Sequence, residues 1–282
     1  MQTLIKTGMI VIIGISLLLF SLNLFKTNIV YKDQIAVLMY HHIYDQDISS
    51  STITTKLFRD QLTLLKNKGY QFISLQQMKE FLDGAPIPKK AVLVTFDDGY
   101  ESFYNNAYPI LKEMSIPAVN FIITGSLEHP QQDIPKKMSR EQIKAMLSDS
   151  SLIEVQCHTD SLHFKNPLGK AMLVGHLSAD GKPETDEQYK HRIVSDTQSC
   201  ISKLNPLNPA PVDTLAYPYG IYNHEAVDDI QEAGIKYAFT ILTKMTTRQA
   251  DHLRIPRINA GSPDITPAIL EKSILRSIIP IK

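Results

Sequence analysis

The sequence has little cysteine and no excess of charge of either sign. Its 282 residues include only Cys157 and Cys200, too few for a disulfide framework, although a single bridge between them stays open. Lysine and arginine together number 29, as do aspartate and glutamate, and no basic block stands out, so there is no electrostatic basis for a nucleic-acid partner. Internal repeats and Gly/Ser-rich linkers are also missing, which favours one sizeable domain after the N-terminus.

The N-terminus carries an uncharged apolar run at residues 9–25, between Lys6 and Lys26. The run lacks the polar stripe of a core helix, is short for a membrane-spanning helix but within the range, and has no clear A-x-A-like cleavage site. We therefore predict an uncleaved signal-anchor within residues 1–30, with a cleaved signal peptide as the alternative. Both place residues 31–282 outside the cytoplasm, either tethered at the outer face of the membrane or secreted.

Strand-like and helix-like segments alternate along the rest of the chain. Strands are predicted at 34–40, 72–73, 91–96, 118–123, 152–157, 213–217, 237–242 and 254–258, with helices at 55–68, 75–82, 102–114, 186–204 and 224–233 and from Ser139 and Pro267 onwards. This alternation is typical of an α/β fold with a parallel sheet. About seven such units favour a distorted (β/α) barrel over an open sheet. The irregular segment 164–185 is expected to be functional or mobile.

The strand at 91–96 ends abruptly in Asp97, Asp98 and Gly99. Adjacent carboxylates repel each other, and a bound cation would offset that repulsion. In parallel α/β folds, ligands bind at the carboxyl ends of the strands, where this pair lies. Asp and Gly also suit a plain turn that caps the next helix, and taken alone the motif favours that interpretation.

Two histidines, His158 and His163, follow the strand at 152–157. With Asp98 they would form a set of two histidines and one aspartate, which suits a catalytic zinc ion that keeps one position open for water. The alternative is a pair of ordinary loop histidines, one of which caps a turn.

Two more strand ends carry polar residues. Tyr219 lies in a Pro-Tyr-Gly turn, which either is structural or exposes a backbone N–H able to bind a developing oxyanion. His41 and His42 follow the first strand and are either a general acid or solvated loop residues. Because the ends of parallel strands converge on one face of a barrel, the joint occurrence of these motifs favours a single site.

The motif Thr-Phe-Asp-Asp-Gly at 95–99, the His-Thr pair at 158–159 with His163, and the Pro-Tyr-Gly turn resemble the polysaccharide deacetylases of carbohydrate esterase family four, also called the NodB-homology family. The resemblance covers residues 34–258. Within the family, the chain is most similar to the extracellular poly-N-acetylglucosamine deacetylases of biofilm formation. These share the early Met-Tyr-His stretch, the wider spacing of the histidines and the Ala-Tyr-Pro-Tyr-Gly form of the turn.

The resemblance implies a metal-dependent hydrolase that removes N-acetyl groups from the GlcNAc units of an extracellular polysaccharide, with poly-N-acetylglucosamine as the expected polymer. Asp98, His158 and His163 would hold the metal. Zinc is the expected ion, although cobalt and nickel accept the same ligands. The polysaccharide and the membrane are the expected partners, and the chain is expected to be a monomer.

The same resemblance assigns Asp97 as the general base, His41 as the general acid and the Tyr219 backbone N–H as an oxyanion donor. Two departures from the family pattern stand beside these roles. Many members have an arginine that orients the catalytic aspartate where this chain has Ala216, and the late Asp-x-x-Asp-Trp motif is missing because the chain has no tryptophan. Arg257 is a candidate replacement for the arginine.

Two other functions remain open at this point. A deacetylase acting on the GlcNAc of peptidoglycan would carry the same catalytic residues. A carbohydrate-binding protein on a degenerate deacetylase scaffold would explain both departures. The presence of a base, three metal ligands and an acid candidate argues against the second alternative, because decay usually removes one of them.

Overall fold

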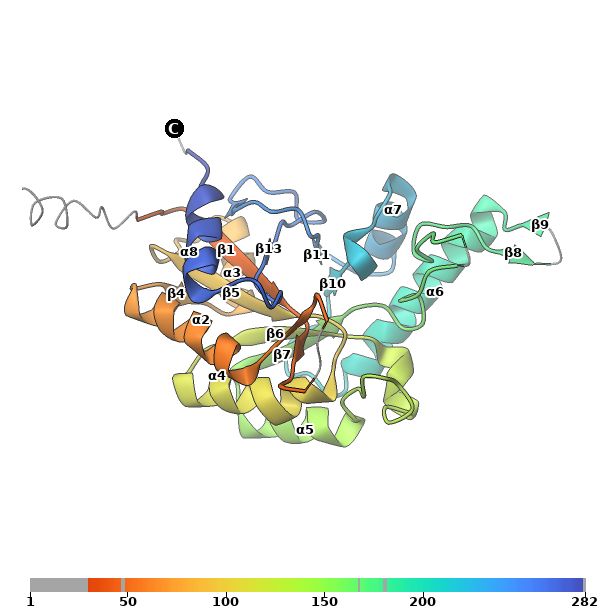
Figure 1. The fold of residues 1–282 in the computed structure, drawn as a ribbon. Helices are drawn as coiled ribbons and strands as arrows, with labels where there is room; N and C mark the ends of the chain where they lie inside the picture. The colour runs from red at the N-terminus through yellow and green to blue at the C-terminus, as the bar shows by residue number, and fades with distance from the viewer. Residues whose placement is uncertain (1–29, 47–48, 167, 180–181, 281–282) are drawn as a thin grey trace, which may run out of the picture. The chain divides into compact units, whose positions relative to one another are not determined.

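The structure is a computed structural model that describes residues 30–46, 49–166, 168–179 and 182–280 (Figure 1). The predicted signal-anchor at 9–25 lies outside these residues. Among the helices that are described, none is both long and apolar enough to cross a membrane.

A curved sheet with a path of seven strands in the order β11-β10-β7-β6-β5-β1-β12 forms the centre of the fold (Figure 1). These strands are β1 (Gln34–Tyr40), β5 (Ala91–Phe96), β6 (Ala118–Ile122), β7 (Ile153–Cys157), β10 (Thr214–Ala216), β11 (Tyr237–Phe239) and β12 (Thr246–Thr247). Neighbours on this path run parallel, except that β12 is antiparallel to β1. The predicted α/β fold is confirmed, but an all-parallel sheet is wrong at β12. The chain between β11 and β12 contains no helix that could serve as a parallel crossover.

Short strands complete the sheet and its surroundings. The strand β4 (Gln71–Phe72) pairs with β5, and β13 (Ile258–Asn259) pairs with β1. Ile255 forms a parallel bridge to Phe239 of β11, so residues 255–259 bond to both β11 and β1. Two further pairs, absent from the sequence prediction, are β2 (His42–Ile43) with β3 (Thr52–Ile53) and β8 (Ser178–Ala179) with β9 (Lys182–Pro183).

The helices follow the predicted alternation closely. They are α2 (Thr55–Asn67), α3 (Leu75–Leu82), α4 (Tyr108–Met114), α5 (Arg140–Asp149), α6 (Asp186–Leu204), α7 (His224–Glu232) and α8 (Pro267–Arg276). The capping box predicted at Ser139 is present. The Ser139 side chain accepts a hydrogen bond from the Gln142 backbone N–H, and the Gln142 side chain accepts one from the Ser139 backbone N–H. The helix predicted at 102–114 is instead a π-helical turn, η1 (Phe103–Ala107), followed by α4.

Side chains of the central strands alternate between two apolar clusters. In β1, β5 and β6, even-numbered residues such as Leu38 and Phe96 pack with residues of α2, α4, α5 and α6. Odd-numbered residues such as Val37 and Leu93 pack on the opposite face, here called the inner face, with Phe121. Because successive strand residues point to opposite faces, an odd-numbered residue that extends β1 or β5 continues the inner face.

Phe58 of α2 supports the ends of the two central strands. It is fully buried, and its ring centroid lies 5.1 Å from that of Tyr40 and 5.6 Å from that of Phe96. We expect Phe58→Ala to lower the free energy of unfolding by about 3–5 kcal/mol, because it leaves a cavity in the core. Denaturant unfolding followed by far-UV circular dichroism measures this. The matched control Phe164→Ala, at a side chain that is 49% exposed, should change the free energy by less than about 0.5 kcal/mol; equal effects would contradict the assignment of the core.

Candidate active site

The carboxyl ends of several parallel strands meet at a cavity of about 260 Å³. The cavity is lined by His41, Ser51, Asp97, Asp98, Tyr100, His158, His163, Tyr219, Gly220 and Ile241. All six residues that the sequence analysis assigned to catalysis or metal binding are in this set. Strands that run in one direction end at one edge of a sheet, which is why motifs far apart in sequence come together.

Asp98, His158 and His163 each offer one ligand atom, and these atoms lie within 4.8 Å of one another. The Asp98 Oδ1 atom is 3.4 Å from Nε2 of His158 and 3.2 Å from Nε2 of His163. This oxygen is buried and accepts no hydrogen bond. A buried carboxylate oxygen without a donor, facing two imidazole nitrogens, fits a bound cation. Within the described part of the chain, no other group of three His, Cys, Asp or Glu side chains meets this condition.

Both imidazoles are prepared to act as ligands through Nε2. Nδ1 of buried His158 lies 2.7 Å from the Ala216 carbonyl oxygen, which only accepts, so Nδ1–H donates and the Nε2 lone pair remains available. Burial and the nearby His158 lower the pKa of His163 to about 4, so its imidazole is neutral at pH 7.

Asp97 has a different partner, Arg257. Nη1 and Nη2 of the arginine each lie 2.7 Å from one carboxylate oxygen of Asp97, and the arginine is fully buried. Burial alone would raise the pKa of Asp97, but the charge and hydrogen bonds of Arg257, together with the nearby His158 and His41, outweigh burial and lower the pKa below the ordinary value. A carboxylate has about four lone-pair sites, and a bidentate arginine uses two of them, so Asp97 still has sites to accept a proton. Arg257 therefore contacts Asp97 as the sequence analysis suggested.

The first strand sends His41, and not His42, into the cavity. His41 continues the inner face of β1, and its Nε2 lies 3.8 Å from Asp97 Oδ2. His42 points the other way, where its Nδ1 is 2.6 Å from the Ser102 hydroxyl and its ring stacks on Tyr44. Strand alternation thus sends these two adjacent histidines to opposite faces.

The Pro-Tyr-Gly turn after β10 is a single 3₁₀ turn, η3 (Pro218–Gly220). Tyr219 has a positive φ of 58°. Gly220 also has a positive φ, and a Cβ there would lie 2.3 Å from the Ile241 side chain, so the turn requires glycine at this position. The Tyr219 ring packs 4.6 Å from the His163 ring, and its hydroxyl donates to the His163 carbonyl oxygen. The turn therefore borders the histidine that faces Asp98.

Lys137 is a charged neighbour that sequence reasoning missed. Its Nζ lies 3.8 Å from the centroid of the Tyr100 ring. Burial lowers the pKa of Lys137, while Asp98 and Asp133 oppose that shift. Nothing in the local sequence signals this position, because it lies in an irregular loop. Tyr100, in contrast, directly follows the Asp-Asp-Gly motif and could have been flagged from that adjacency.

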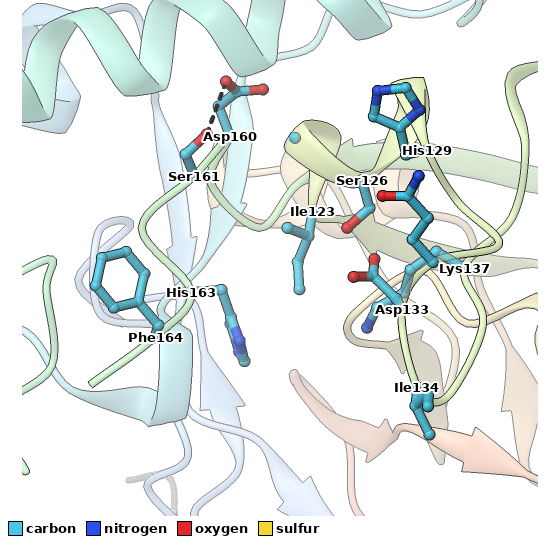
Figure 2. Close-up of a pocket in the computed structure, with 12 residues that line it drawn as sticks. Ile123, Ser126, His129, Asp133, Ile134, Lys137, Asp160, Ser161, His163 and Phe164 are labelled. Carbon is cyan, nitrogen blue, oxygen red and sulfur yellow. Dashed lines mark hydrogen bonds between the residues drawn. The ribbon is translucent and has the colours of Figure 1, made fainter. Parts of the chain in front are cut away.

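A second cavity, of about 480 Å³, adjoins the first at His163, which lines both (Figure 2). Figure 2 shows Asp160, Ser161 and Phe164 on one side of it and Asp133 and His129 on the other. The candidate site therefore continues into a polar hollow with an aromatic side chain at its edge.

The buried pair of Asp97 and Arg257 predicts a stability effect that depends on pH. Arg257→Met leaves an unpaired buried carboxylate, and we expect a loss of about 3–5 kcal/mol at pH 7 in the presence of a chelator. The lowered pKa of Asp97 stabilises the native state above the unfolded pKa of about 3.9, and this contribution is lost as the pH falls through the folded-state pKa. The difference between wild type and Arg257→Met should therefore shrink as the pH falls below about 4.

Denaturant unfolding across this pH range measures the effect. Arg254→Met is the matched control, because Arg254 pairs with Asp251 at a more exposed position, and it should cost at most about 1 kcal/mol. A difference between wild type and Arg257→Met that does not vary with pH would contradict the assignment.

Comparison with known proteins places these residues in a family. A sequence profile described as polysaccharide deacetylase matches residues 84–238. The chain is 30% identical over 220 residues to the poly-beta-1,6-N-acetyl-D-glucosamine N-deacetylase of Staphylococcus aureus strain MSSA476, and the match covers 78% of this chain and 71% of the relative.

Solved structures show the same fold. IcaB from Ammonifex degensii is 29% identical with a TM-score of 0.72, and the match covers 86% of this chain and 97% of IcaB. A de-N-acetylase from Aggregatibacter actinomycetemcomitans is 25% identical with a TM-score of 0.76, covering 86% of this chain and all of that one. The residues matched by the family profile include Asp97, Asp98, His158, His163 and Tyr219. As the sequence motifs predicted, the chain belongs to the polysaccharide deacetylase family.

Proposed function

We propose that the chain removes N-acetyl groups from the β-linked N-acetylglucosamine units of poly-N-acetylglucosamine. One observation carries the proposal: Asp98 faces His158 and His163, while the adjacent Asp97 is held separately by Arg257. A metal-dependent deacetylase needs a cation site and an unligated base side by side, and this pair of carboxylates supplies both. The Staphylococcus aureus relative, which is named for this polymer, supports the choice of substrate.

The metal that the family implies fits these residues. Asp98 Oδ1 has no hydrogen-bond donor, and the hydrogen bond from His158 Nδ1 to Ala216 leaves Nε2 as the ligand atom. We propose zinc, with cobalt and nickel as acceptable substitutes for this ligand set. When bound, such a cation supplies Lewis-acid polarisation of the acetyl carbonyl and makes water more acidic.

Different residues of the chain accept and donate the protons of the reaction. Ionised Asp97 takes a proton from the water that attacks the acetyl carbon. The Tyr219 backbone N–H donates to the oxygen on which negative charge develops. His41, 3.8 Å from Asp97, gives a proton to the amide nitrogen as the C–N bond breaks, leaving acetate and an amine. Arg257 keeps Asp97 ionised and fixes the orientation of the carboxylate that accepts the proton.

The two adjoining cavities suit a polymer better than a single sugar. The cavity of about 260 Å³ holds the reacting groups, and the cavity of about 480 Å³ continues from His163 (Figure 2). Its lining combines Phe164, which is 49% exposed, with polar side chains such as Ser161 and Asp133. Aromatic and polar groups side by side suit the apolar faces and hydroxyls of neighbouring sugar units.

The remaining expectations are part of the same proposal. The apolar run at 9–25 supports a location at the extracellular face of the membrane, where the polymer is accessible. The bonding of residues 255–259 to both β11 and β1 supports treating the curved sheet as a distorted barrel. A monomer is proposed because all the assigned residues come from one chain.

Two assays separate this proposal from its alternatives. Acetate release that requires added zinc and is abolished by a chelator would exclude a binding-only protein, and zinc-dependent release from neither polymer would contradict the proposal. A comparison of amine formation on poly-N-acetylglucosamine and on peptidoglycan distinguishes the substrates. We expect the former to be the better substrate by kcat/KM, and a preference for peptidoglycan would overturn that choice.

The metal assignment predicts the behaviour of Asp98→Ala. We expect this variant to lose stoichiometric zinc and, with it, measurable acetate release, because the remaining two histidines do not complete a catalytic site. Zinc content after dialysis and acetate release measure the two effects. Asp60→Ala, at a partly exposed side chain on α2, is the control and should retain both. Full zinc content and activity in Asp98→Ala would contradict the assignment of Asp98 as a metal ligand.

The acid and base assignments predict a different phenotype. His41→Ala and Asp97→Asn should each lower kcat by roughly 10²–10⁴ while zinc content stays near wild type, because neither residue is assigned as a ligand. Steady-state kinetics on the polymer, with metal analysis of the same samples, tests this. Full zinc content with unchanged kcat in His41→Ala would transfer the acid role to another group.

A further inference from the structure

The loop at 157–163, which carries both histidines, is locally strained. His158 and His163 are separated by four residues, so the chain between them must fold back for both to face Asp98. Thr159 has a positive φ of 78°. A β-branched residue in the left-handed region costs about 1–3 kcal/mol and persists only where its surroundings enforce it. The loop therefore depends on contacts outside itself.

One face of α6 supplies three such contacts. The Asp196 carboxylate accepts the backbone N–H of Asp160 at 2.9 Å and that of Ser161 at 2.7 Å. Cys200 forms a disulfide with Cys157, which settles the question left open by the sequence. Lys203 Nζ lies 2.8 Å from Asp160 Oδ1. The three α6 residues lie at i, i+4 and i+7, on one side of the helix.

The opposite side of the loop is held by the turn η2 (Thr124–Glu128). The N–H of Thr124 donates to the Thr159 carbonyl oxygen at 3.1 Å, and that of Gly125 donates to the Asp160 carbonyl oxygen at 2.8 Å. A Cβ on Gly125 would lie 2.5 Å from the Asp160 carbonyl oxygen, so the approach requires glycine. The strained residue is thus fixed between a helix and a turn.

These contacts act directly on the residues between the two histidines. Asp160 and Ser161 follow Thr159, and Asp196 holds both of their amides at once. Burial raises the pKa of Asp196 to about 6 even though the two amides oppose the shift, so at pH 7 the carboxylate is ionised and accepts both hydrogen bonds. Burial of Cys157 and Cys200 keeps the covalent contact away from solvent.

We propose that Asp196, together with Lys203 and the Cys157–Cys200 disulfide, is a positioning group that sets the separation of His158 and His163 for metal binding. This inference rests on the proposed function, in which these histidines hold the metal with Asp98. None of the three α6 side chains lines the cavity that holds Asp98, His158 and His163, or the cavity that adjoins it. Their effect passes through the backbone of the loop, as partners behind metal ligands commonly act, and loss of such partners typically weakens metal affinity 10–100-fold.

The first test is Asp196→Ala in the full chain. We expect zinc to bind roughly 10–100-fold more weakly, measured by competition with a chromophoric chelator, and the visible absorption bands of the cobalt-substituted protein to change. The cobalt spectrum reports the ligand arrangement, which a general loss of stability does not alter. Asp229→Asn, at another buried carboxyl on the neighbouring α7, is the control and should leave affinity and spectrum unchanged.

The second test uses Lys203, in case Asp196→Ala does not fold. Lys203→Met should weaken zinc binding, and Lys203→Arg, which keeps a cation for Asp160, should restore it. Lys190→Met breaks another α6 ion pair, with Glu232, away from the loop, and should have no effect. Circular dichroism confirms that each variant is folded. A double Cys157→Ser and Cys200→Ser variant should bind zinc more weakly than wild type.

The outcomes distinguish the two proposals. If the wild-type chain binds no zinc, the proposed function fails. If the wild type binds zinc while the folded Asp196, Lys203 and double-cysteine variants match its affinity and cobalt spectrum, the positioning role is overturned and the metal site stands.

Discussion

The buried ion pair between Asp97 and Arg257 is the constraint on which the site depends. A fully buried guanidinium is costly unless its donors are used, and here Nε donates to the Thr240 carbonyl oxygen while Nη1 and Nη2 reach Asp97 at 2.7 Å each. The cation also lies 5.8 Å from the centroid of the Phe121 ring. The pair therefore ties the end of β5 to β11 and to the last strand segment. Neither charge can move without leaving the other buried and unpaired, which fixes the Asp97 carboxylate in place.

The two adjacent aspartates acquire separate roles because the backbone changes direction between them. Asp97 keeps the alternation of β5 and points to the inner face with Thr95 and Arg257. Asp98 has a positive φ of 74°, which departs from the strand and sends its carboxylate toward His158 and His163. Asp97 therefore pairs with Arg257, whereas Asp98 faces the two histidines. The repulsion expected between neighbouring anions is answered by Arg257 on one side and by the candidate metal site on the other.

How far sequence could predict this arrangement depends on the range of each contact. Strand ends followed by polar motifs are local signals, so the α/β fold, the capping box at Ser139 and the convergence of Asp98, His158 and His163 could be predicted. Alternation along β1 would also have separated His41 from His42, because His41 continues the inner face. Lys137 and the antiparallel β12 could not be predicted in this way, because an irregular loop and a short edge strand are placed by the tertiary fold. The disulfide stayed open for the same reason, since Cys157 and Cys200 are 43 residues apart.

The residues matched by the family profile do not include every residue of the candidate site, and Arg257 is one of those left out. The profile matches residues 84–238, which contain the assigned metal ligands and Asp97 but neither His41 nor Arg257. These two residues come from opposite ends of the described chain, yet β13 pairs with β1 in parallel, so both reach Asp97 from neighbouring strands. Ala216, where many members of the family have the arginine, packs in the inner cluster with Phe121 and Phe239, the rings that lie near the Arg257 guanidinium. An arginine from either position would approach Asp97 through the same interior space. The orienting charge can therefore be supplied from a different strand, and the position of Asp97, the proposed base, then depends on the C-terminal segment that joins β11 to β1.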